Sequence, residues 1–443
     1  MMDTAAIPEA PLTPVYPFNA PGAPIVLHDG LVGGLAPIDV AGIVELRCQP
    51  EFGLEWSVAP DAPPFFANSS AVTLLLRRAG GDMRVQGCPR GFEGGWADGA
   101  EFGDADVPLK RIIVHWFNLP DWGGQTGLTM STPDGAARTW SRGRWRHQSG
   151  EWQITIDVRP DHAAVWENLH AQRVYVMTHV MELSRVDGSL FTAAEAEPVL
   201  DALQVAVSFA LGRWVAPMLP VGKDVSDNVV WERWQSLFCD PARRPSSGWW
   251  YDRDLGSLAA LLDLVIEEFN VPDRRTALSM QIKYAITAIY DRGFMEQRVT
   301  IGAAGLEHLM WQTLVLTDRL TKPEYKSTHA YKMLRTLLTE ANIPTTIDAD
   351  VLPAAAAFAA AAEHTQGHRL DGAEVVTQIR NRLVHPEGTQ DAVYGTEGLV
   401  RDVWLLTRNY LALLILHSLG YVGAYRNLTR VTGHPEIGKV PWA

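Results

Sequence analysis

The sequence has few cysteines, and those it has are widely separated. Only three of the 443 residues are cysteines, namely Cys48, Cys88 and Cys239, and no two of them form a Cys-x-x-Cys pair. An odd number of distant cysteines argues against both a disulfide framework and a cysteine zinc site. This usage fits a reducing compartment, so we expect a cytoplasmic protein.

The sequence also lacks a secretory signal and a long uninterrupted apolar run. The N-terminal stretch MMDTAAIPEAPLTPVYPF has no basic start, and its prolines prevent an apolar helix. The most apolar late segment, residues 403–422, contains Arg408 and Asn409, which leaves too few consecutive apolar residues to cross a bilayer core of about 30 Å. We therefore expect no membrane partner.

Basic residues are in the minority. The chain has 38 Lys and Arg against 51 Asp and Glu, a formal net charge of -13. Non-specific attraction of the whole protein to nucleic acid is therefore excluded, and any such contact requires a local basic patch. The apolar fraction of 47% and charged fraction of 20% are typical of a soluble globular protein, and 443 residues suffice for two domains.

The first half of the chain has the pattern of an antiparallel β domain. Residues 1–23 form a Pro-rich and Ala-rich stretch that predicts an extended tail with little function. Residues 24–192 contain short β-like runs separated by Gly, Pro and Asp clusters, such as PIVLHDG, GIVELRC, AVTLLLRR and WQITIDV. This spacing predicts an antiparallel sandwich or barrel.

The second half has helical periodicity. Residues 193–248 predict a helical connector that ends in the linker DPARRPSSG, and residues 249–443 predict an all-α bundle. We expect helices at residues 256–270, 273–291, 297–317, 323–341, 350–364, 371–385 and 396–420. The chain is thus expected to be an α+β protein of two domains.

Common cofactor and metal motifs are missing. Gly222-Lys223 is the only plausible phosphate-loop dipeptide, but Pro217 stands where the Walker pattern needs Gly and Asp224 stands where it needs Ser or Thr. No HExxH, GxSxG or suitably placed GxGxxG occurs. We therefore expect neither a metal nor an organic cofactor.

Polar residues gather at the end of one late helix, in the segment QIRNRLVHPEG at 378–388. With about 100° per residue, Asn381 and His385 share one face, together with Glu374, and Arg380 reaches the same area through its long side chain. Pro386 is expected to end the helix at His385. A histidine that titrates near neutral pH beside a permanent cation suits phosphodiester cleavage, in which His transfers protons and Arg stabilises phosphate charge.

A purely structural explanation of this segment is also open. Basic residues near a helix C-terminus often only satisfy free carbonyl groups and the helix dipole. Helical context, the Arg-Asn pair and the four residues between Arg380 and His385 favour the functional interpretation.

The segment IRNRLVHP resembles the R-x4-6-H signature of HEPN domains. The order of a β-rich N-terminal region and a helical C-terminal region is similar to that of the ApeA-like antiphage proteins. The likeness covers roughly residues 250–425 at the level of motif and helices, and the first half only as domain order.

The resemblance implies an HEPN-like helical bundle and a metal-independent endoribonuclease of antiphage or abortive-infection defence, with tRNA as one candidate substrate. It implies that Arg380 and His385 are catalytic and that Asn381 orients them. It also implies attack by a 2'-hydroxyl that leaves a cyclic phosphate and a 5'-hydroxyl, and a composite site in a homodimer formed by the helical domains. A phage-derived trigger would act at the N-terminal domain. A regulatory or sensing role for this domain is a hypothesis that accompanies the interpretation of the chain as an RNA-cleaving effector.

Further residues are candidates for contacts with RNA. Lys326 and Lys332 belong to a basic stretch in an acidic protein and would guide the backbone, or else form a solvated helix face. Arg382 is either an RNA contact or simply solvated, and Tyr394 lies in a polar loop as a substrate contact or a loop anchor. Glu307-His308 is expected to be a hydrogen-bonded core pair, with a supporting role at the site as the second interpretation.

Two other functions stay open. One is a non-catalytic HEPN-like module that dimerises and binds a partner or nucleotide through the same polar cluster. The other is a β domain that binds a glycan or peptide, for which LPDWGGQTG would present Trp122 on an exposed loop.

Overall fold

The computed structural model describes the chain in two compact units. One unit comprises Met1–Gln204 and Val215–Pro245, and the other comprises Val205–Trp214 and Ser246–Ala443. The described residues are 7–35, 38–59, 71–91, 93–131, 135–242, 247–251, 253–290, 293–385, 392–430 and 436–443. The first unit is rich in β-strands and the second in helices, which confirms the expected α+β division into a β-rich and a helical part.

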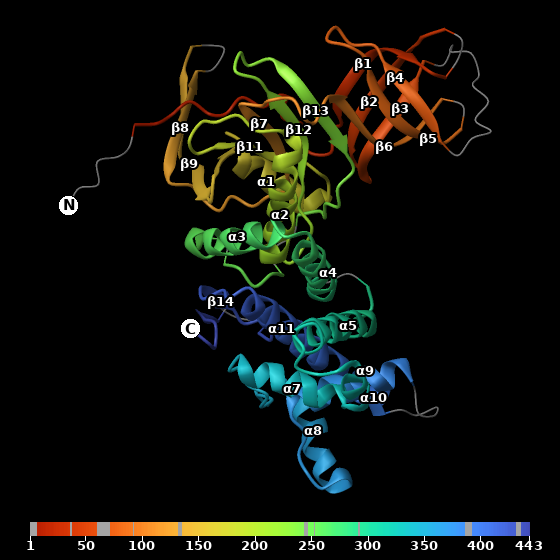
Figure 1. The fold of residues 1–443 in the computed structure, drawn as a ribbon, viewed down its shortest axis with the longest axis vertical. Coiled ribbons are helices and arrows are strands. Elements are labelled where there is room, and N and C mark those ends of the chain that lie inside the picture. The colour runs from red at the N-terminus through yellow and green to blue at the C-terminus, as the bar shows by residue number, and fades with distance from the viewer. Residues whose placement is uncertain are drawn as a thin grey trace. The chain divides into compact units, whose positions relative to one another are not determined.

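The first six strands form a closed barrel (Figure 1). They are β1 (Ile25–Gly33), β2 (Val40–Cys48), β3 (Phe52–Val58), β4 (Val72–Leu76), β5 (Met83–Pro89) and β6 (Gly94–Gly103). They pair antiparallel in the order β3-β2-β1-β4-β5-β6, and β3 pairs with β6 to close the ring. In β2 every second residue is buried, as expected for a strand with one face toward a core.

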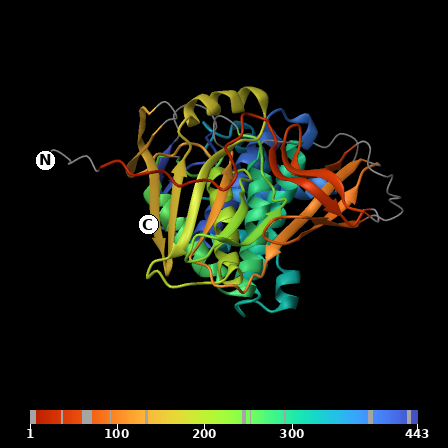
Figure 2. The same ribbon diagram turned by 90° about the horizontal axis from the view of Figure 1, so that it is seen from above.

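The barrel continues into an open antiparallel sheet because β6 also pairs with β13. In spatial order the open sheet contains β13 (Val229–Gln235), β12 (Pro217–Lys223), β7 (Arg111–Phe117), β11 (Met177–Arg185), β10 (Trp152–Val158), β9 (Ala137–Ser149) and β8 (Thr126–Ser131). Figure 2 shows these strands side by side. The central strand β7 is buried at six consecutive residues, from Ile112 to Phe117, so both of its faces are covered.

Two helices accompany this sheet, namely α1 (His162–Gln172) and α2 (Ala193–Leu211). A separate small core of Val165, Trp166, Leu169, Val174, Val176 and Ala242 surrounds α1. A capping box begins α2, because Thr192 and Glu195 exchange side-chain to backbone hydrogen bonds of 2.7 and 3.2 Å.

The N-terminal segment contacts the sheet, whereas the sequence predicted a tail with little function. Arg144 contacts both Glu9 and Asp157, with distances of 2.7 and 2.6 Å, and the backbone N–H of Leu12 donates to Asp157 at 2.6 Å. Tyr16 donates to the buried carboxylate of Glu232. The segment is therefore held by buried charged groups.

The second unit is built from helices. They are α3 (Leu255–Phe269), α4 (Pro272–Ile289), α5 (Met295–Leu314), α6 (Lys322–Ser327), α7 (Ala330–Glu340), α8 (Pro353–Gln366), α9 (Gly372–Val384), α10 (Ala392–Gly395) and α11 (Leu399–Ser418), followed by a hairpin of β14 (Ala424–Arg426) and β15 (Ile437–Lys439). Helix α11 contacts α4, α5, α8 and α9. It is buried at every residue from Asp402 to Leu416, so it forms the centre of this unit.

Local sequence signals fix several helix starts. Pro272 occupies the first turn of α4, where its missing N–H costs no helical hydrogen bond. Helix α6 begins with a capping box of Thr321 and Glu324, and α9 begins with one of Asp371 and Glu374.

Three expectations from the sequence are wrong. The segment 193–248 is not only a helical connector, because β12 and β13 within it join the open sheet. The predicted helix 323–341 is two helices, α6 and α7, because Thr328 and His329 have extended backbone angles. Trp122 does not lie on an exposed loop: it is 3% exposed and packs against Trp145 and His179.

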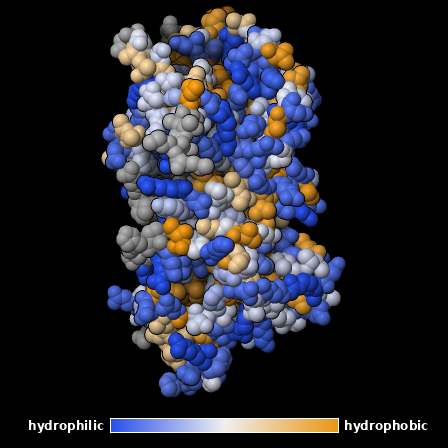
Figure 3. Space-filling model, turned by 90° about the vertical axis from the view of Figure 1, so that its left-hand side faces the viewer, coloured by the Kyte–Doolittle hydropathy of each residue, from blue (hydrophilic) through white to orange (hydrophobic). Residues whose placement is uncertain are grey.

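On the face drawn in Figure 3, hydrophilic residues predominate and apolar residues form small separate groups. Within the described residues, no helix combines the length and the apolar character that crossing a membrane requires.

Candidate functional site

Helix α9 carries the polar segment singled out in the sequence, and Arg380 on it reaches across to α5. One guanidinium nitrogen of Arg380 lies 3.0 Å from the carboxylate of Glu307, and the other donates a 3.1 Å hydrogen bond to the side-chain oxygen of Asn381. The Arg380 side chain is 26% exposed and that of Glu307 is 43% exposed. Arg380 is therefore oriented by two partners and still reaches solvent.

Helix α9 ends at the predicted position. It runs to Val384, and His385 is its C-cap residue, with its backbone N–H bonded to the Asn381 carbonyl at 2.7 Å. The side chains of Asn381 and His385 are both exposed. Pro386, which was expected to end the helix, lies outside the described residues. The helix end thus presents an imidazole to solvent.

The cavity that adjoins Arg380 is small. It lies between α5, α7 and α9 and is lined by Glu307, Met310, Leu334 and Thr377, among others. Its volume of about 20 Å³ is room for one water molecule and not for a nucleotide. A nucleotide that contacts Arg380 therefore does not fit inside this cavity.

Glu374 shares the face of α9 with Asn381 in the sequence pattern, but it acts at the other end of the helix. Its backbone N–H and carboxylate form the capping box with Asp371 at 2.9 and 3.1 Å. The same carboxylate lies 3.0 Å from Arg335 and 3.0 Å from His368. Glu374 is buried and has a structural role at the start of α9.

The predicted basic stretch is divided between two helices. Lys326 lies in the last turn of α6 and Lys332 in the first turn of α7, and both side chains are exposed. Arg335, on the same stretch, is bound by Asp371 and Glu374 at 2.5 and 3.0 Å. The exposed lysines of α6 and α7 therefore carry the accessible positive charge of this stretch.

Two further predicted contacts lie on different elements. The guanidinium of Arg382 lies 5.5 Å from the ring centre of Phe358 on α8, and its side chain is half-buried. Tyr394 is 62% exposed in the short helix α10. The loop between α9 and α10, residues 386–391, lies outside the described residues.

Sequence reasoning did not identify Glu307 as the partner of Arg380. It predicted a core pair of Glu307 and His308, which is wrong because Glu307 bonds Arg380 and is half-exposed. His308 instead packs near Tyr284, and burial lowers the pKa of its imidazole. Only the second interpretation, that Glu307 supports the site, agrees with this contact. An isolated Glu in an apolar helix carries no signal for a partner 73 positions later.

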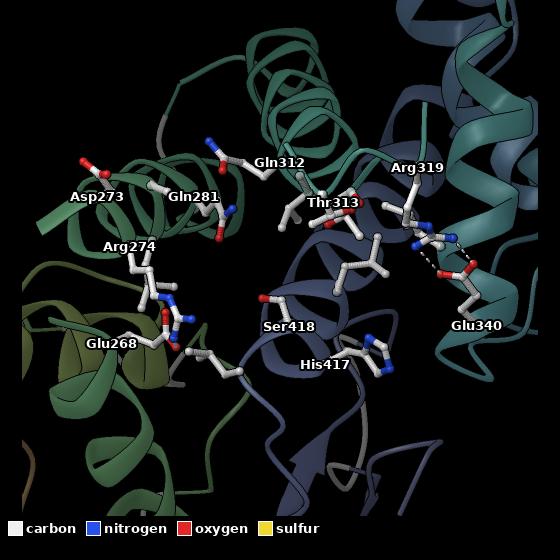
Figure 4. Close-up of a pocket in the computed structure, with 17 residues that line it drawn as sticks. Glu268, Asp273, Arg274, Gln281, Gln312, Thr313, Arg319, Glu340, His417 and Ser418 are labelled. Atoms are coloured by element: carbon white, nitrogen blue, oxygen red, sulfur yellow. Dashed lines mark hydrogen bonds and ion pairs between the residues drawn. The ribbon is translucent and has the colours of Figure 1, made fainter. Parts of the chain in front are cut away.

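A separate pocket of about 640 Å³ lies elsewhere in the helical unit (Figure 4). Helices α3, α4, α5, α7 and α11 contribute its walls. Two ion pairs stand at its edges: Arg274 lies 3.1 Å from Glu268, and Arg319 donates to Glu340 at 3.1 Å. Gln281 lines the pocket and is only 6% exposed.

Two segments of the chain match known family models. Residues 104–245 match the YopA central domain and residues 272–437 match the YopA C-terminal domain. Both segments resemble domains of YopA. The first covers the open sheet with α1 and α2, and the second covers α4 to α11, so the six-stranded barrel lies outside both matches.

The chain is also similar to the SPbeta prophage-derived uncharacterized protein YopA of Bacillus subtilis (strain 168). The two are 28% identical over 314 residues, which are 68% of this chain and 66% of the relative. The match thus spans just under two thirds of that relative. No solved structure matches the chain.

Proposed function

We propose that the chain is a metal-independent endoribonuclease of the HEPN type, with Arg380 and His385 as catalytic residues and Asn381 as a positioning residue. The observation that carries the proposal is that one helix end presents an oriented, partly exposed guanidinium and an exposed imidazole five residues apart. These are the two groups that cleavage of a phosphodiester needs: a proton carrier and a fixed cation.

The reaction needs these side chains, the RNA and water. The 2'-oxygen of the substrate forms a bond to phosphorus while the bond from phosphorus to the 5'-oxygen breaks. The His385 imidazole takes the proton of the 2'-hydroxyl, and the leaving 5'-oxygen gains a proton from water or from the imidazolium of a second copy of His385. Arg380 stabilises the charge that builds on the two non-bridging oxygens.

The Glu307 ion pair does not prevent this role. A half-exposed pair of this kind contributes only about 0 to 1 kcal/mol, so little free energy is needed to release the guanidinium from Glu307. Phosphate therefore competes well with Glu307 for the guanidinium of Arg380. Lys326, Lys332, Arg382 and Tyr394 remain the proposed contacts with the rest of the RNA, and tRNA is a candidate substrate.

A homodimer completes the site in this proposal. The small cavity beside Arg380 supports it, because this cavity alone has no room for a nucleotide. Two copies of the α9 end would supply two arginines and two histidines to one scissile bond.

The β-rich unit would restrain the nuclease or sense a phage-derived trigger, as part of antiphage defence by abortive infection. The domain order supports this, and the description of the relative as prophage-derived is compatible with a role in conflict between phage and host. The cytoplasm, where RNA is found, is the proposed location.

RNA cleavage in EDTA tests the proposal. Purified protein is incubated with tRNA and with total RNA, beside the variants Arg380→Ala, His385→Ala, Asn381→Ala and Asn381→Asp. We expect Arg380→Ala and His385→Ala to lose cleavage. Asn381→Asp should retain more activity than Asn381→Ala, because the aspartate keeps a hydrogen-bond acceptor for Arg380.

Matched controls separate this role from a general effect of removing charge. His364 is an exposed histidine in the last turn of α8, and Arg47 is an ion-paired arginine of the β unit that is 33% exposed. His364→Ala and Arg47→Ala should cleave like the unchanged protein. Equal cleavage by all variants would remove Arg380 and His385 from the mechanism.

A non-catalytic dimerising module is the second candidate. The ion pair between Arg380 and Glu307 favours it, because a structural arginine is also expected to have an acidic partner. Absence of cleavage by a stable dimer, together with dissociation of that dimer by Arg380→Ala, would support this alternative.

A further inference from the structure

We propose that the pocket of about 640 Å³ in the helical unit binds an uncharged, planar, polar small molecule of the nucleoside or free nucleobase class. This site is distinct from the α9 end, since none of Arg380, Asn381 and His385 lines it. The proposal does not depend on the ribonuclease proposal. The volume of the pocket lies within the range of about 300 to 1,000 Å³ that small-molecule sites occupy.

The buried amide of Gln281 is the main reason to expect a ligand. Gln281 is 6% exposed, and within the described part of the chain its side chain makes no hydrogen bond. Figure 4 shows its amide directed toward the open centre of the pocket. An amide that faces a pocket without a protein partner is available to a ligand, so a group that hydrogen-bonds with both its donor and its acceptor is favoured there.

The chemistry of an amide defines the group that it would hold. Gln281 offers a donor and an acceptor side by side in one plane, which is the pattern that the edge of a nucleobase or another cyclic amide complements. Gln312 supplies a second amide at the rim, and the hydroxyl groups of Thr313 and Ser418 lie on the same lining. Ser418 donates to the Ile415 carbonyl at 2.8 Å, so its oxygen faces a ligand mainly as an acceptor.

The charges of the pocket disfavour a phosphorylated ligand. The two arginines of the lining, Arg274 and Arg319, are outnumbered by the acidic residues Glu268, Asp273 and Glu340. Burial lowers the pKa of His417, which disfavours the cationic form of its imidazole. No unpaired cation among the described lining residues therefore balances a di- or triphosphate.

The remaining lining is apolar and suits the faces of a flat ring. Leu278, Leu309 and Leu414 are each no more than 4% exposed and line the pocket from α4, α5 and α11. Leucine side chains on several sides bury the faces of a heterocycle while the amides bind its edge. A sugar hydroxyl is compatible with the polar rim.

Calorimetric titration and thermal shift test the proposal with the full chain. The probes are adenosine, guanosine, cytidine and uridine, the four free bases, and the corresponding 5'-triphosphates. We expect at least one nucleoside or base to bind saturably and to raise Tm, with the triphosphate of the same base binding about tenfold or more weakly. Gln281→Leu should weaken the binding of that probe by about tenfold or more, since two hydrogen bonds are lost.

The same variant gives a readout that shows whether it folds. Because Leu replaces an amide without partners, Gln281→Leu should raise the Tm of the ligand-free protein, whereas an unfolded variant would show no transition. If Gln281→Leu does not fold, Gln281→Met serves in its place. Gln366→Leu is the matched control, because Gln366 is exposed at the end of α8 and bonds Gln378 outside the pocket.

Three results would overturn the proposal. They are the absence of binding by all nucleosides and bases up to millimolar concentration, tighter binding of a triphosphate than of its nucleoside, and equal binding by Gln281→Leu and the unchanged protein. A loss of RNA cleavage without a loss of nucleoside binding would instead concern only the site on α9.

Discussion

The guanidinium of Arg380 lies 3.0 Å from the carboxylate of Glu307, so an ion pair joins the end region of α9 to the middle of α5. The two residues are 73 positions apart in the sequence and lie in neighbouring helices that contact one another. The pair fixes the direction in which Arg380 points, and it places an acidic competitor where a phosphate would bind.

Glu307→Gln should strengthen RNA binding at Arg380. Without the carboxylate, the phosphate no longer competes for the guanidinium, and KM for RNA should fall by up to about fivefold, since a half-exposed pair contributes about 0 to 1 kcal/mol. Steady-state cleavage kinetics with a defined RNA measure this change in KM. Glu55→Gln, which removes a comparable ion pair with Arg47, is the control. A raised KM would show that Glu307 supports binding instead of opposing it.

Asp157→Ala should destabilise the β-rich unit by about 3 to 5 kcal/mol. Asp157 is 2% exposed and its carboxylate bonds Arg144, so its removal leaves a buried guanidinium without its main partner. The variant also removes the acceptor for the Leu12 backbone, and the N-terminal segment should become more sensitive to protease. Urea unfolding and limited proteolysis measure the two effects.

Asp39→Ala provides the comparison for this experiment. Asp39 pairs with Arg77 at 2.8 Å on the surface of the barrel, where both side chains are well exposed. Its removal should change stability by less than about 1 kcal/mol. Equal losses for the two variants would contradict the role assigned to the buried pair.

Glu232 should make the β-rich unit less stable as pH rises. Burial raises the pKa of Glu232 to about 7, although Arg78, Trp234 and Tyr16 contact its carboxylate. An unfolded glutamate has a pKa of about 4.3, so from that pH to about 7 the folded chain holds a proton that the unfolded chain has lost, and stability falls through this window.

Glu232→Gln removes this titration and should flatten the pH dependence. Between pH 5 and pH 8 the free energy of unfolding of the unchanged protein should fall by about 1 to 3 kcal/mol relative to the variant. Urea unfolding of both proteins across this range measures the difference. Parallel curves would show that Glu232 stays charged when folded.

Helices were the most predictable part of the fold. Apolar residues at helical spacing, with Pro272 at the start of α4 and the capping box of Asp371 and Glu374 at the start of α9, place most helix boundaries within a few residues. The break between α6 and α7 was missed because the segment keeps a helical apolar pattern on both sides of Thr328 and His329.

Strands in the interior of the sheet were harder to predict from the sequence. The segment PMLPVGK of β12 is buried from Pro217 to Gly222, so it lacks the alternation that marks a half-exposed strand, and its prolines and glycine suggest a loop. Trp122 looked like an exposed loop residue because Pro and Gly flank it, but its burial depends on Trp145 and His179, which are distant in sequence.

The candidate site was predictable only in its local part. The end of α9 at His385 followed from residues in one segment, whereas the Glu307 partner of Arg380 is a tertiary contact that no spacing rule contains. The pocket around Gln281 likewise combines residues from five helices.

The chemical nature of the ends left by RNA cleavage tests the central claim most directly. A short RNA labelled at its 5' end is incubated with the protein in EDTA, and the products are analysed by mass spectrometry beside those of Arg380→Ala and His385→Ala. The account predicts a 2',3'-cyclic phosphate and a 5'-hydroxyl with the unchanged protein, and no products with either variant. A product with a 3'-hydroxyl, or unchanged cleavage by both variants, would contradict it.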